Sequence, residues 1–250
     1  MQLALEERVA IVTGASRGLG RAAAAALLAE GARVLGTTRD GAALDGLRER
    51  FGADRVAVAT CDMTDLDAVA ALPARALEAF GRLDIVVNNA GLAPAGPFLD
   101  QGPDVWREVF AVNVFAPAEL SRAAGALLLE QGSGKVINVA STSGLLGKPT
   151  LAAYSASKGA VLQMTKALAG EWAARGVQVN AIAPGAFETD AQAAVLEDPA
   201  ILERRLRKIP AKRMGRPDEF GPLVCLLASP VSDFVTGSVF VTDGGESSKL

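Results

Sequence analysis

The feature that most constrains the fold is a series of short runs rich in β-branched residues, separated by longer stretches of helical character. Apolar and polar residues hardly alternate within these runs, which is typical of strands buried on both faces of a sheet. Regular helical crossovers between such strands predict an α/β fold in one domain, residues 1–250, with a doubly wound parallel sheet and helices on both faces. About seven strands are expected, at residues 9–13, 33–38, 56–60, 85–88, 136–140, 177–183 and 239–241.

The sequence contains no histidine, which removes several kinds of chemistry at once. Ser-His-Asp and Cys-His nucleophile pairs are excluded, and so are histidine metal ligands. The two cysteines, Cys61 and Cys225, lie far apart in apolar surroundings, so we expect two buried free thiols, no disulfide and no metal site. Acid–base chemistry therefore depends on Asp, Glu, Lys, Tyr or Cys.

Net charge and hydropathy argue against nucleic acid and membranes as binding partners of this protein. The formal net charge is -3 and basic residues are scattered among acidic ones, which argues against binding to nucleic acid. No stretch reaches the roughly 18 apolar residues that cross a bilayer, and charged residues at 6–8 interrupt the start before the core of a signal peptide. We expect a cytoplasmic protein with no membrane partner. The final tripeptide, Ser248-Lys249-Leu250, matches the peroxisomal address, which has meaning only in a eukaryote.

A glycine-rich loop, TGASRGLG, follows the first expected strand at residues 13–20 and leads into an alanine-rich helix that ends near residue 30. Glycines here allow a tight turn, let the backbone approach a pyrophosphate and let the helix pack closely on the sheet, while the helix N-terminus attracts the phosphates. The spacing is G-x3-G-x-G, and its place between strand and helix predicts a Rossmann-type dinucleotide site. The expected phosphate-binding residues are Gly14, Ser16, Arg17, Gly18, Leu19 and Gly20.

The end of the second expected strand indicates which dinucleotide is bound. An acidic residue at this place takes the ribose hydroxyls of NAD, but here the place holds Thr38, followed by Arg39. A guanidinium pairs with a 2′-phosphate, and Arg17 adds a second positive charge, so the sequence favours NADP(H). Asp40 leaves NAD(H) open, because a shift of one residue would bring a carboxylate to the ribose.

Asp62 and Met63 come just after the third expected strand, where the adenine end of the cofactor would lie. The Asp62 carboxylate is placed to accept a hydrogen bond from the adenine amine. A helix-capping role before Leu66 is the alternative.

The only tyrosine, Tyr154, stands four residues before Lys158, near the start of an expected helix that runs to about residue 175. Positions four apart share one helix face, and an adjacent cation is expected to lower the phenol pKa from about 10 towards the working range of a general acid/base. Alone, such a pair is most often an ordinary surface pair. Here Ser141 follows an expected strand at the carboxyl edge of the sheet, where ligands bind, and Asn113 lies in a helix behind that edge.

The joint motif set resembles that of the short-chain dehydrogenase/reductase family, in its single-domain branch. The match runs from residue 7 to residue 245 and includes TGASRGLG, NNAG at 88–91, Asn113, Ser141, YSASK at 154–158, the Pro-Gly pair at 184–185 and Asp-Gly-Gly at 243–245. The resemblance implies that Tyr154 is the general acid/base and that Ser141 orients the substrate oxygen. It also implies that Lys158 lowers the tyrosine pKa and binds the nicotinamide ribose, while Asn113 supports a water that relays protons to Lys158.

The same resemblance implies which residues meet the nicotinamide end of the cofactor. They are Asn89, Ala90, Gly91, Pro184, Gly185, Phe187 and Thr189, together with Tyr154 and Lys158. Phe187 stands where the family more often has valine, so the shape of that contact departs from the family pattern.

Residues 186–216 are the least regular segment, and we expect them to form a substrate lid of one or two helices beyond a strand's carboxyl end. A packed surface hairpin is the alternative. Basic residues of this segment suit either a carboxylate or an acidic carrier protein, or they form a solvated helix face. They are Arg204, Arg205, Arg207 and Lys208.

The segment 179–189 and the residues 197–199 that follow most resemble gluconate 5-dehydrogenases and related sugar-acid enzymes. The implied function is an NADP(H)-dependent oxidoreductase that moves a hydride between the nicotinamide and a carbonyl or secondary alcohol of a small molecule. The alternatives are a 3-oxoacyl carrier-protein reductase and a catalytically idle NADP-binding scaffold. Apolar residues on more than one face of the helix that holds Tyr154 indicate a homo-oligomer, and the resemblance implies a tetramer.

Overall fold

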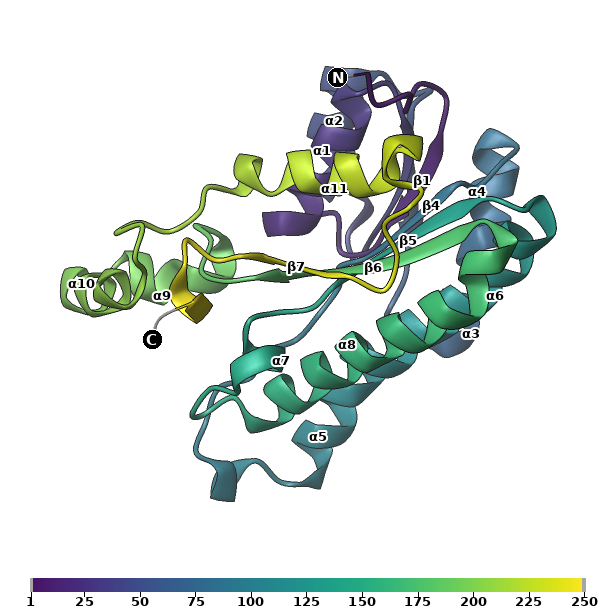
Figure 1. The fold of residues 1–250 in the computed structure, drawn as a ribbon. Helices are drawn as coiled ribbons and strands as arrows, with labels where there is room; N and C mark the ends of the chain where they lie inside the picture. The colour runs from purple at the N-terminus through teal and green to yellow at the C-terminus, as the bar shows by residue number, and fades with distance from the viewer. Residues whose placement is uncertain (1, 249–250) are drawn as a thin grey trace.

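The computed structural model describes residues 2–248, whose seven strands form one sheet (Figure 1). The strands are β1 (Val9–Val12), β2 (Arg33–Thr38), β3 (Val56–Thr60), β4 (Ile85–Asn88), β5 (Gly134–Val139), β6 (Val177–Pro184) and β7 (Val239–Thr242). The α-helices are α1 (Gly18–Ala29), α2 (Asp45–Phe51), α3 (Leu66–Ala70), α4 (Leu72–Phe80), α5 (Pro103–Phe110), α6 (Ala116–Gln131), α7 (Ser143–Leu146), α8 (Ala152–Trp172), α9 (Ala193–Leu196), α10 (Pro199–Lys208) and α11 (Gly221–Ala228).

The strand order is β3-β2-β1-β4-β5-β6-β7, and every neighbouring pair is parallel. Helices α1, α2 and α11 pack on one face of the sheet, and α3, α4, α6 and α8 pack on the other (Figure 1). The winding reverses between β1 and β4, so the connections after these strands leave towards opposite faces and open a crevice at the carboxyl ends. The predicted doubly wound parallel sheet is therefore confirmed.

The β-branched runs locate every strand but not every strand end. β5 begins at Gly134, two residues before its expected start, because Gly134 and Lys135 pair with β6 through their backbones although neither is β-branched. β6 and β7 each continue one residue beyond their expected ends, and β1 and β5 each end one residue before theirs. Backbone pairing with the neighbouring strand decides these limits, and side-chain composition does not report it.

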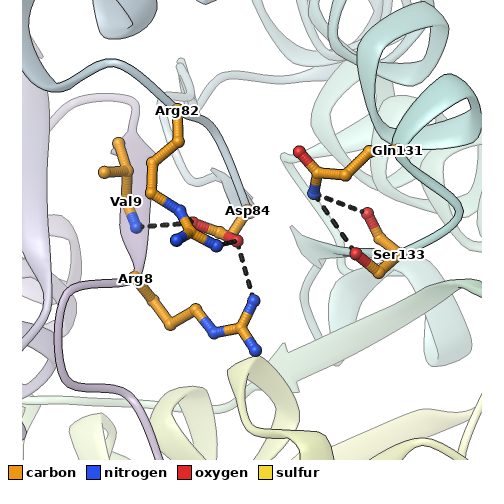
Figure 2. A network of polar contacts seen from close by, with 6 residues as sticks. All are labelled: Arg8, Val9, Arg82, Asp84, Gln131 and Ser133. Atoms are coloured by element: carbon orange, nitrogen blue, oxygen red, sulfur yellow. Dashed lines mark hydrogen bonds and ion pairs between the residues drawn. The ribbon is translucent and has the colours of Figure 1, made fainter.

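The amino edge of the sheet, opposite the crevice, is held by one buried carboxylate. Asp84 precedes β4 and is 3% exposed, and Figure 2 shows Arg8 and Arg82 converging on it. Arg82 donates to both carboxylate oxygens at 2.7 and 2.8 Å, while Arg8 and the Val9 backbone N–H each donate at 2.9 Å. Burial alone would raise the pKa of Asp84, but these hydrogen bonds outweigh it and hold the pKa below its usual value. The start of β4 is thereby tied to the start of β1.

The segment 186–216 extends beyond the carboxyl end of β6 and contains α9 and α10. Asp198 caps α10 by accepting hydrogen bonds from two backbone N–H groups of its first turn. Ile209 and Met214 are buried in a small cluster with Ala186, apart from the main core. Neither α9 nor α10 contains a fully buried residue. The segment is therefore packed against the protein at its base, while its two helices remain partly exposed to solvent.

Three further expectations concern single features. Within residues 2–248, no helix is long and apolar enough to span a bilayer. Cys61 and Cys225 are both buried, as predicted, and burial raises the pKa of Cys225 to about 12. Lys249 and Leu250 of the C-terminal tripeptide lie outside the described residues.

Candidate active site

One cavity of about 590 Å³ lies at the carboxyl ends of the central strands. Every residue predicted to contact the cofactor lines it, and so does Ser141. The glycine loop and Arg39 belong to the same cavity as Tyr154 and Lys158, which come from the first two turns of α8. Asn113 is the predicted site residue that does not line it.

Glycines of the loop after β1 make room for an extended ligand. Gly14 and Gly18 have φ values of +65° and +53°, in the left-handed region that residues with a side chain rarely adopt. A Cβ at Gly20 would overlap the Gly14 carbonyl oxygen and the Asn89 side-chain amide. Because α1 begins at Gly18, its unpaired N–H groups and the positive end of its dipole lie at the cavity. The loop therefore fits a pyrophosphate.

Asn89 holds the two sides of the crevice together as well as lining it. Its Nδ2 donates to the carbonyl oxygens of Thr13 and Gly14 at 2.9 and 3.3 Å. In return the Thr13 hydroxyl accepts from the backbone N–H groups of Asn89 and Ala90 at 2.9 and 3.0 Å. The NNAG motif thus clamps the end of β4 onto the end of β1, where the winding reverses.

At the end of β2 the cavity is lined by Arg39, whereas the Asp40 carboxylate caps the turn that follows the strand. Asp40 Oδ1 accepts from the Ala42 N–H at 3.1 Å and caps the 3₁₀ turn that begins at Gly41. The Thr38 hydroxyl donates to the Asp40 carbonyl at 2.9 Å and fixes the same turn. The charge that β2 presents to the cavity is therefore the guanidinium of Arg39.

Asp62 also lines the cavity, and its alternative role as a helix cap is wrong. Its Oδ1 accepts from the Thr64 backbone N–H at 2.9 Å and from the Thr64 hydroxyl at 2.8 Å. Helix α3 is capped instead by Asp65, which accepts from the Ala68 N–H at 3.0 Å, because Asp65 is the residue directly before the helix. Hydrogen bonds from Thr64 lower the pKa of Asp62.

Ser141, Tyr154 and Lys158 meet between β5 and α8. Ser141 Oγ accepts from the Ser143 N–H at 3.1 Å, at the start of α7. The Lys158 ammonium donates to the Val139 carbonyl at 2.8 Å and lies over the Tyr154 ring, 5.8 Å from its centroid. The spacing of four residues therefore makes the phenol and the ammonium neighbours, as the sequence predicts.

Burial governs the protonation of both groups. It raises the pKa of the Tyr154 phenol above its usual value, and an interaction with the Ser141 hydroxyl opposes this only in part. It lowers the pKa of Lys158 to about 8. The sequence predicts a lowered tyrosine pKa, and this prediction is wrong here, because burial is the larger effect and raises the pKa. A protonated phenol therefore lies beside a lysine whose pKa is closer to neutral pH than that of an exposed lysine.

Asn113 supports the wall of the cavity from behind. It is fully buried in a π-helical segment between α5 and α6, where the sequence predicts an ordinary helix, and such π-bulges recur at functional sites. Its amide accepts from the Leu92 N–H at 2.8 Å and donates to the Leu92 carbonyl at 2.9 Å. A Cβ at Gly91 would come within 3.3 Å of Asn113 Oδ1 and 3.5 Å of Lys158 Nζ. Asn113, Gly91 and Lys158 thus pack as one unit.

The segment after β6 closes against the glycine loop. The Phe187 ring packs edge-on against Phe220, with centroids 6.1 Å apart, and covers Gly215. Thr189 lies against the glycine loop, since a Cβ at Gly18 would be 3.5 Å from its methyl group. Both residues also line the cavity.

Sequence reasoning missed several residues of the site. Glu108 and Val112, from α5 and the π-helical segment, line the cavity, and so does Gln192 from the expected lid. No local pattern marks them, because they reach the cavity only through the packing of distant elements. Gly144 was also missed: a Cβ there would lie 2.7 Å from the carbonyl carbon of Lys158, so α7 rests directly on the backbone of α8.

Known proteins resemble this chain along nearly its whole length. The family model described as enoyl-(acyl carrier protein) reductase matches residues 14–247. Galactitol 2-dehydrogenase (L-tagatose-forming) from Cereibacter sphaeroides is 41% identical over 243 residues, which cover 96% of this chain and 95% of that protein. The 2-dehydro-3-deoxy-D-gluconate 5-dehydrogenase of Pseudoalteromonas atlantica is 38% identical over 249 residues, 98% of this chain and 97% of that protein. The structure of a gluconate 5-dehydrogenase from Burkholderia cenocepacia in complex with NADP and tartrate matches with a TM-score of 0.93 at 34% identity, covering 100% of this chain and 98% of that one.

Fold, cavity and relatives together define an oxidoreductase of the Rossmann type. The chain belongs to the short-chain dehydrogenase/reductase family, and it is an enzyme of that family. The resemblance on which the motif roles rest is thereby confirmed.

Proposed function

We propose that the protein is an NADP(H)-dependent dehydrogenase that interconverts a secondary alcohol and a carbonyl on a small polyhydroxylated substrate. The observation that carries this proposal is one cavity with Ser141, Tyr154 and Lys158 at one end and the glycine loop with Arg39 at the other. A dinucleotide along this cavity would reach the Tyr154 end with its nicotinamide.

The preference for NADP(H) rests on the charges at the phosphate end. Arg39 and Arg17 both line the cavity, and a guanidinium pairs well with a 2′-phosphate. The Asp40 carboxylate, which would favour NAD(H), caps the turn after β2. The Burkholderia cenocepacia relative was solved with NADP, which supports the same choice. Bound NADP(H) supplies or takes up the hydride.

The side chains of the site then manage the proton. In the reducing direction the substrate carbonyl oxygen accepts hydrogen bonds from Tyr154 and Ser141 as it gains negative charge, and then takes the phenolic proton. Because burial raises the pKa of Tyr154, the phenol is protonated and ready to donate at neutral pH. Lys158, with a pKa of about 8, is suited to resupply that proton, and Asn113 holds the backbone of Leu92, next to Gly91 and Lys158, in place.

The substrate class follows from the relatives and from the lid. Two of the relatives, at 41% and 38% identity, are named for a polyol and for a sugar acid, which supports a hydroxylated carbon chain over the 3-oxoacyl thioester of relatives such as the 35% identical 3-oxoacyl-[acyl-carrier-protein] reductase of Vibrio harveyi. Residues 186–216 act as the lid in this proposal: Gln192 lines the cavity, Ile209 and Met214 anchor the base, and the helices between bury no residue fully.

We also propose a cytoplasmic homotetramer. Exposed apolar side chains on several elements support it, since large apolar residues left on the surface often mark contacts between subunits. They are Phe115, Leu145, Leu146, Val231, Phe234 and Val241. Sedimentation at micromolar concentration should show a tetramer, and a monomer alone would contradict this.

The test of the function is Tyr154→Phe, which removes one hydroxyl and keeps the ring. NADPH binding, followed by fluorescence titration, should stay within about twofold of wild type. Turnover of a polyol with NADP+ should fall by about 100- to 10,000-fold, the usual contribution of a general acid/base. Activity comparable with wild type would refute the assignment.

A further inference from the structure

Gln101 is a buried glutamine that lies outside the catalytic cavity but is bonded to the start of the helix that holds Tyr154. It comes just before α5 and is 9% exposed. Its Nε2 donates to the carbonyl oxygens of Gly96 and Thr150, both at 3.0 Å. Its Oε1 accepts from the Ala153 backbone N–H at 3.3 Å. One side chain therefore joins the loop between β4 and α5 to the loop between α7 and α8.

The bond to Ala153 supplies a cap that α8 lacks locally. The first N–H groups of a helix have no partner within it, and a polar side chain at the N-cap usually accepts from one of them. Leu151 occupies the N-cap position of α8 and cannot do so. Gln101, 52 positions earlier in the chain, accepts from the N–H of Ala153, the residue directly before Tyr154.

The backbone that leads into α8 is strained. Thr150, a β-branched residue, has a φ of +64°, in the left-handed region. Such a conformation persists only where the surroundings determine it. Here the Thr150 carbonyl accepts from the Gly96 backbone N–H at 2.9 Å and from Gln101 at 3.0 Å. These two hydrogen bonds hold the entry to α8 in a shape that the chain would not keep by itself.

Asn113 holds the other side of Tyr154. Its Nδ2 donates to the Ser157 hydroxyl at 3.0 Å, and that hydroxyl donates to the Tyr154 carbonyl at 2.7 Å. Gln101 and Asn113 stand on either side of α5, which packs beside α8 (Figure 1). The backbone of Tyr154 is thus held just before the residue through Gln101 and just after it through Asn113.

We propose that Gln101 is a positioning residue for Tyr154: its amide holds the first turn of α8 so that the phenol stays buried beside Ser141. This inference rests on the proposed function and adds to it a residue that lines no part of the cavity. Two donors and one acceptor are needed at fixed places, which an amide provides and neither a carboxylate nor a hydrocarbon side chain can.

Gln101→Met tests the proposal by kinetics, because it keeps an unbranched chain of the same length and removes all three hydrogen bonds. A displacement of about 1 Å at a reacting centre costs about 100-fold in rate, so a smaller shift of the phenol should lower kcat for polyol oxidation by NADP+ by about 10- to 100-fold. NADPH binding should change by less than about threefold, since the glycine loop and Arg39 lie on other elements. Gln101→Asn, whose shorter amide cannot reach all three groups, should show the same split between kcat and NADPH binding.

A spectroscopic test needs no substrate, because Tyr154 is the only tyrosine of the chain. The ultraviolet absorbance of tyrosinate during a pH titration therefore reports the pKa of this residue alone. Burial raises that pKa in the wild type. In Gln101→Met the loosened first turn should admit water to the phenol, so the pKa should fall towards its ordinary value of about 10. Circular dichroism over the same pH range checks that the variant stays folded.

Ser229→Ala is the matched control for a loss of stability. Ser229 is fully buried at the end of α11, outside the cavity, and its hydroxyl accepts from the Val231 N–H at 3.2 Å and donates to the Leu3 carbonyl. This variant should have a lower melting temperature, as Gln101→Met should, but keep the kcat and the tyrosine pKa of wild type.

A wild-type kcat or an unshifted tyrosine pKa in folded Gln101→Met would overturn the inference, and so would equal changes in Ser229→Ala. Equal losses of kcat and NADPH binding in Gln101→Met would make Gln101 a general structural residue and overturn it too. Absence of turnover of every alcohol and carbonyl with either nicotinamide would refute the proposed function, while the tyrosine titration still decides whether Gln101 positions Tyr154.

Discussion

Gly144→Ala tests whether the contact between α7 and α8 sets the geometry of the active site. A Cβ at position 144 would lie 2.7 Å from the Lys158 carbonyl carbon and 2.9 Å from the Gly159 nitrogen. Ordinary contact begins near 3.4 Å, so the two helices must separate by about 0.5 to 0.7 Å. Both contacts are with backbone, which cannot swing aside as a side chain can. The shift would move Ser141, held by α7, relative to Tyr154 on α8.

A displacement of about 1 Å at a reacting centre costs about 100-fold in rate, so a smaller shift should lower kcat by about 10- to 100-fold. Overpacking should also cost about 1 to 3 kcal/mol of stability. Gly159→Ala is the matched control at the same interface: its Cβ would lie 3.6 Å from the Gly144 carbonyl oxygen, an ordinary contact. It should leave kcat within about twofold and raise the melting temperature slightly, because alanine favours a helix.

The assays are steady-state kinetics with NADP+, thermal unfolding and NADPH titration on both variants. NADPH binding should weaken far less than kcat, since the glycine loop is on another element. Wild-type kcat in Gly144→Ala, or an equal loss in Gly159→Ala, would refute the argument that this contact positions the catalytic side chains.

Two further predictions concern charge. Asp84→Asn should destabilise the fold by about 1 to 3 kcal/mol, because Arg8 and Arg82 lose charge-assisted hydrogen bonds to a buried carboxylate while both guanidinium groups still reach water. The pKa of Asp84 is lowered on folding, so its contribution is present above the unfolded value of about 3.9 and is lost as the pH falls through the folded pKa. The gap in unfolding free energy between wild type and variant should therefore stay constant from about pH 7 to pH 5 and shrink as the pH falls from about 5 to 3, and a gap that stays constant down to pH 3 would contradict this. Arg39→Asp should weaken NADPH binding by about 10- to 100-fold in fluorescence titration, with NADH unaffected or improved, whereas equal weakening of both would exclude a 2′-phosphate contact.

The strands and the two main motifs were predictable because their information is local. A run of β-branched residues reports burial on both faces, and the glycine loop follows β1 directly along the chain. Tyr154 and Lys158 are neighbours because one helical turn separates them. In each case the distance along the sequence sets the distance in space.

Other features depended on neighbours from remote segments. Asp62 and Asp65 both precede α3, and only the structure shows that Asp65 is its cap. Glu108 and Gln192 reach the cavity through the packing of α5 and the lid. Gly144 carries no signal in the sequence, because its role is a contact with the backbone of α8.

The sequence by itself therefore determined the chemistry: the lack of histidine, the glycine loop and the Tyr154–Lys158 spacing point to hydride transfer with a tyrosine as proton donor. The tertiary structure decided the pKa values of the catalytic side chains and the ion pairs of the lid. Burial raises the Tyr154 pKa where the sequence predicts a lowered one, and Arg205 of the lid forms an ion pair with Glu246 from the C-terminal segment. The physical reason is that residue type and spacing specify which atoms are present, whereas burial and ion pairing arise only when segments far apart in the chain exclude water together.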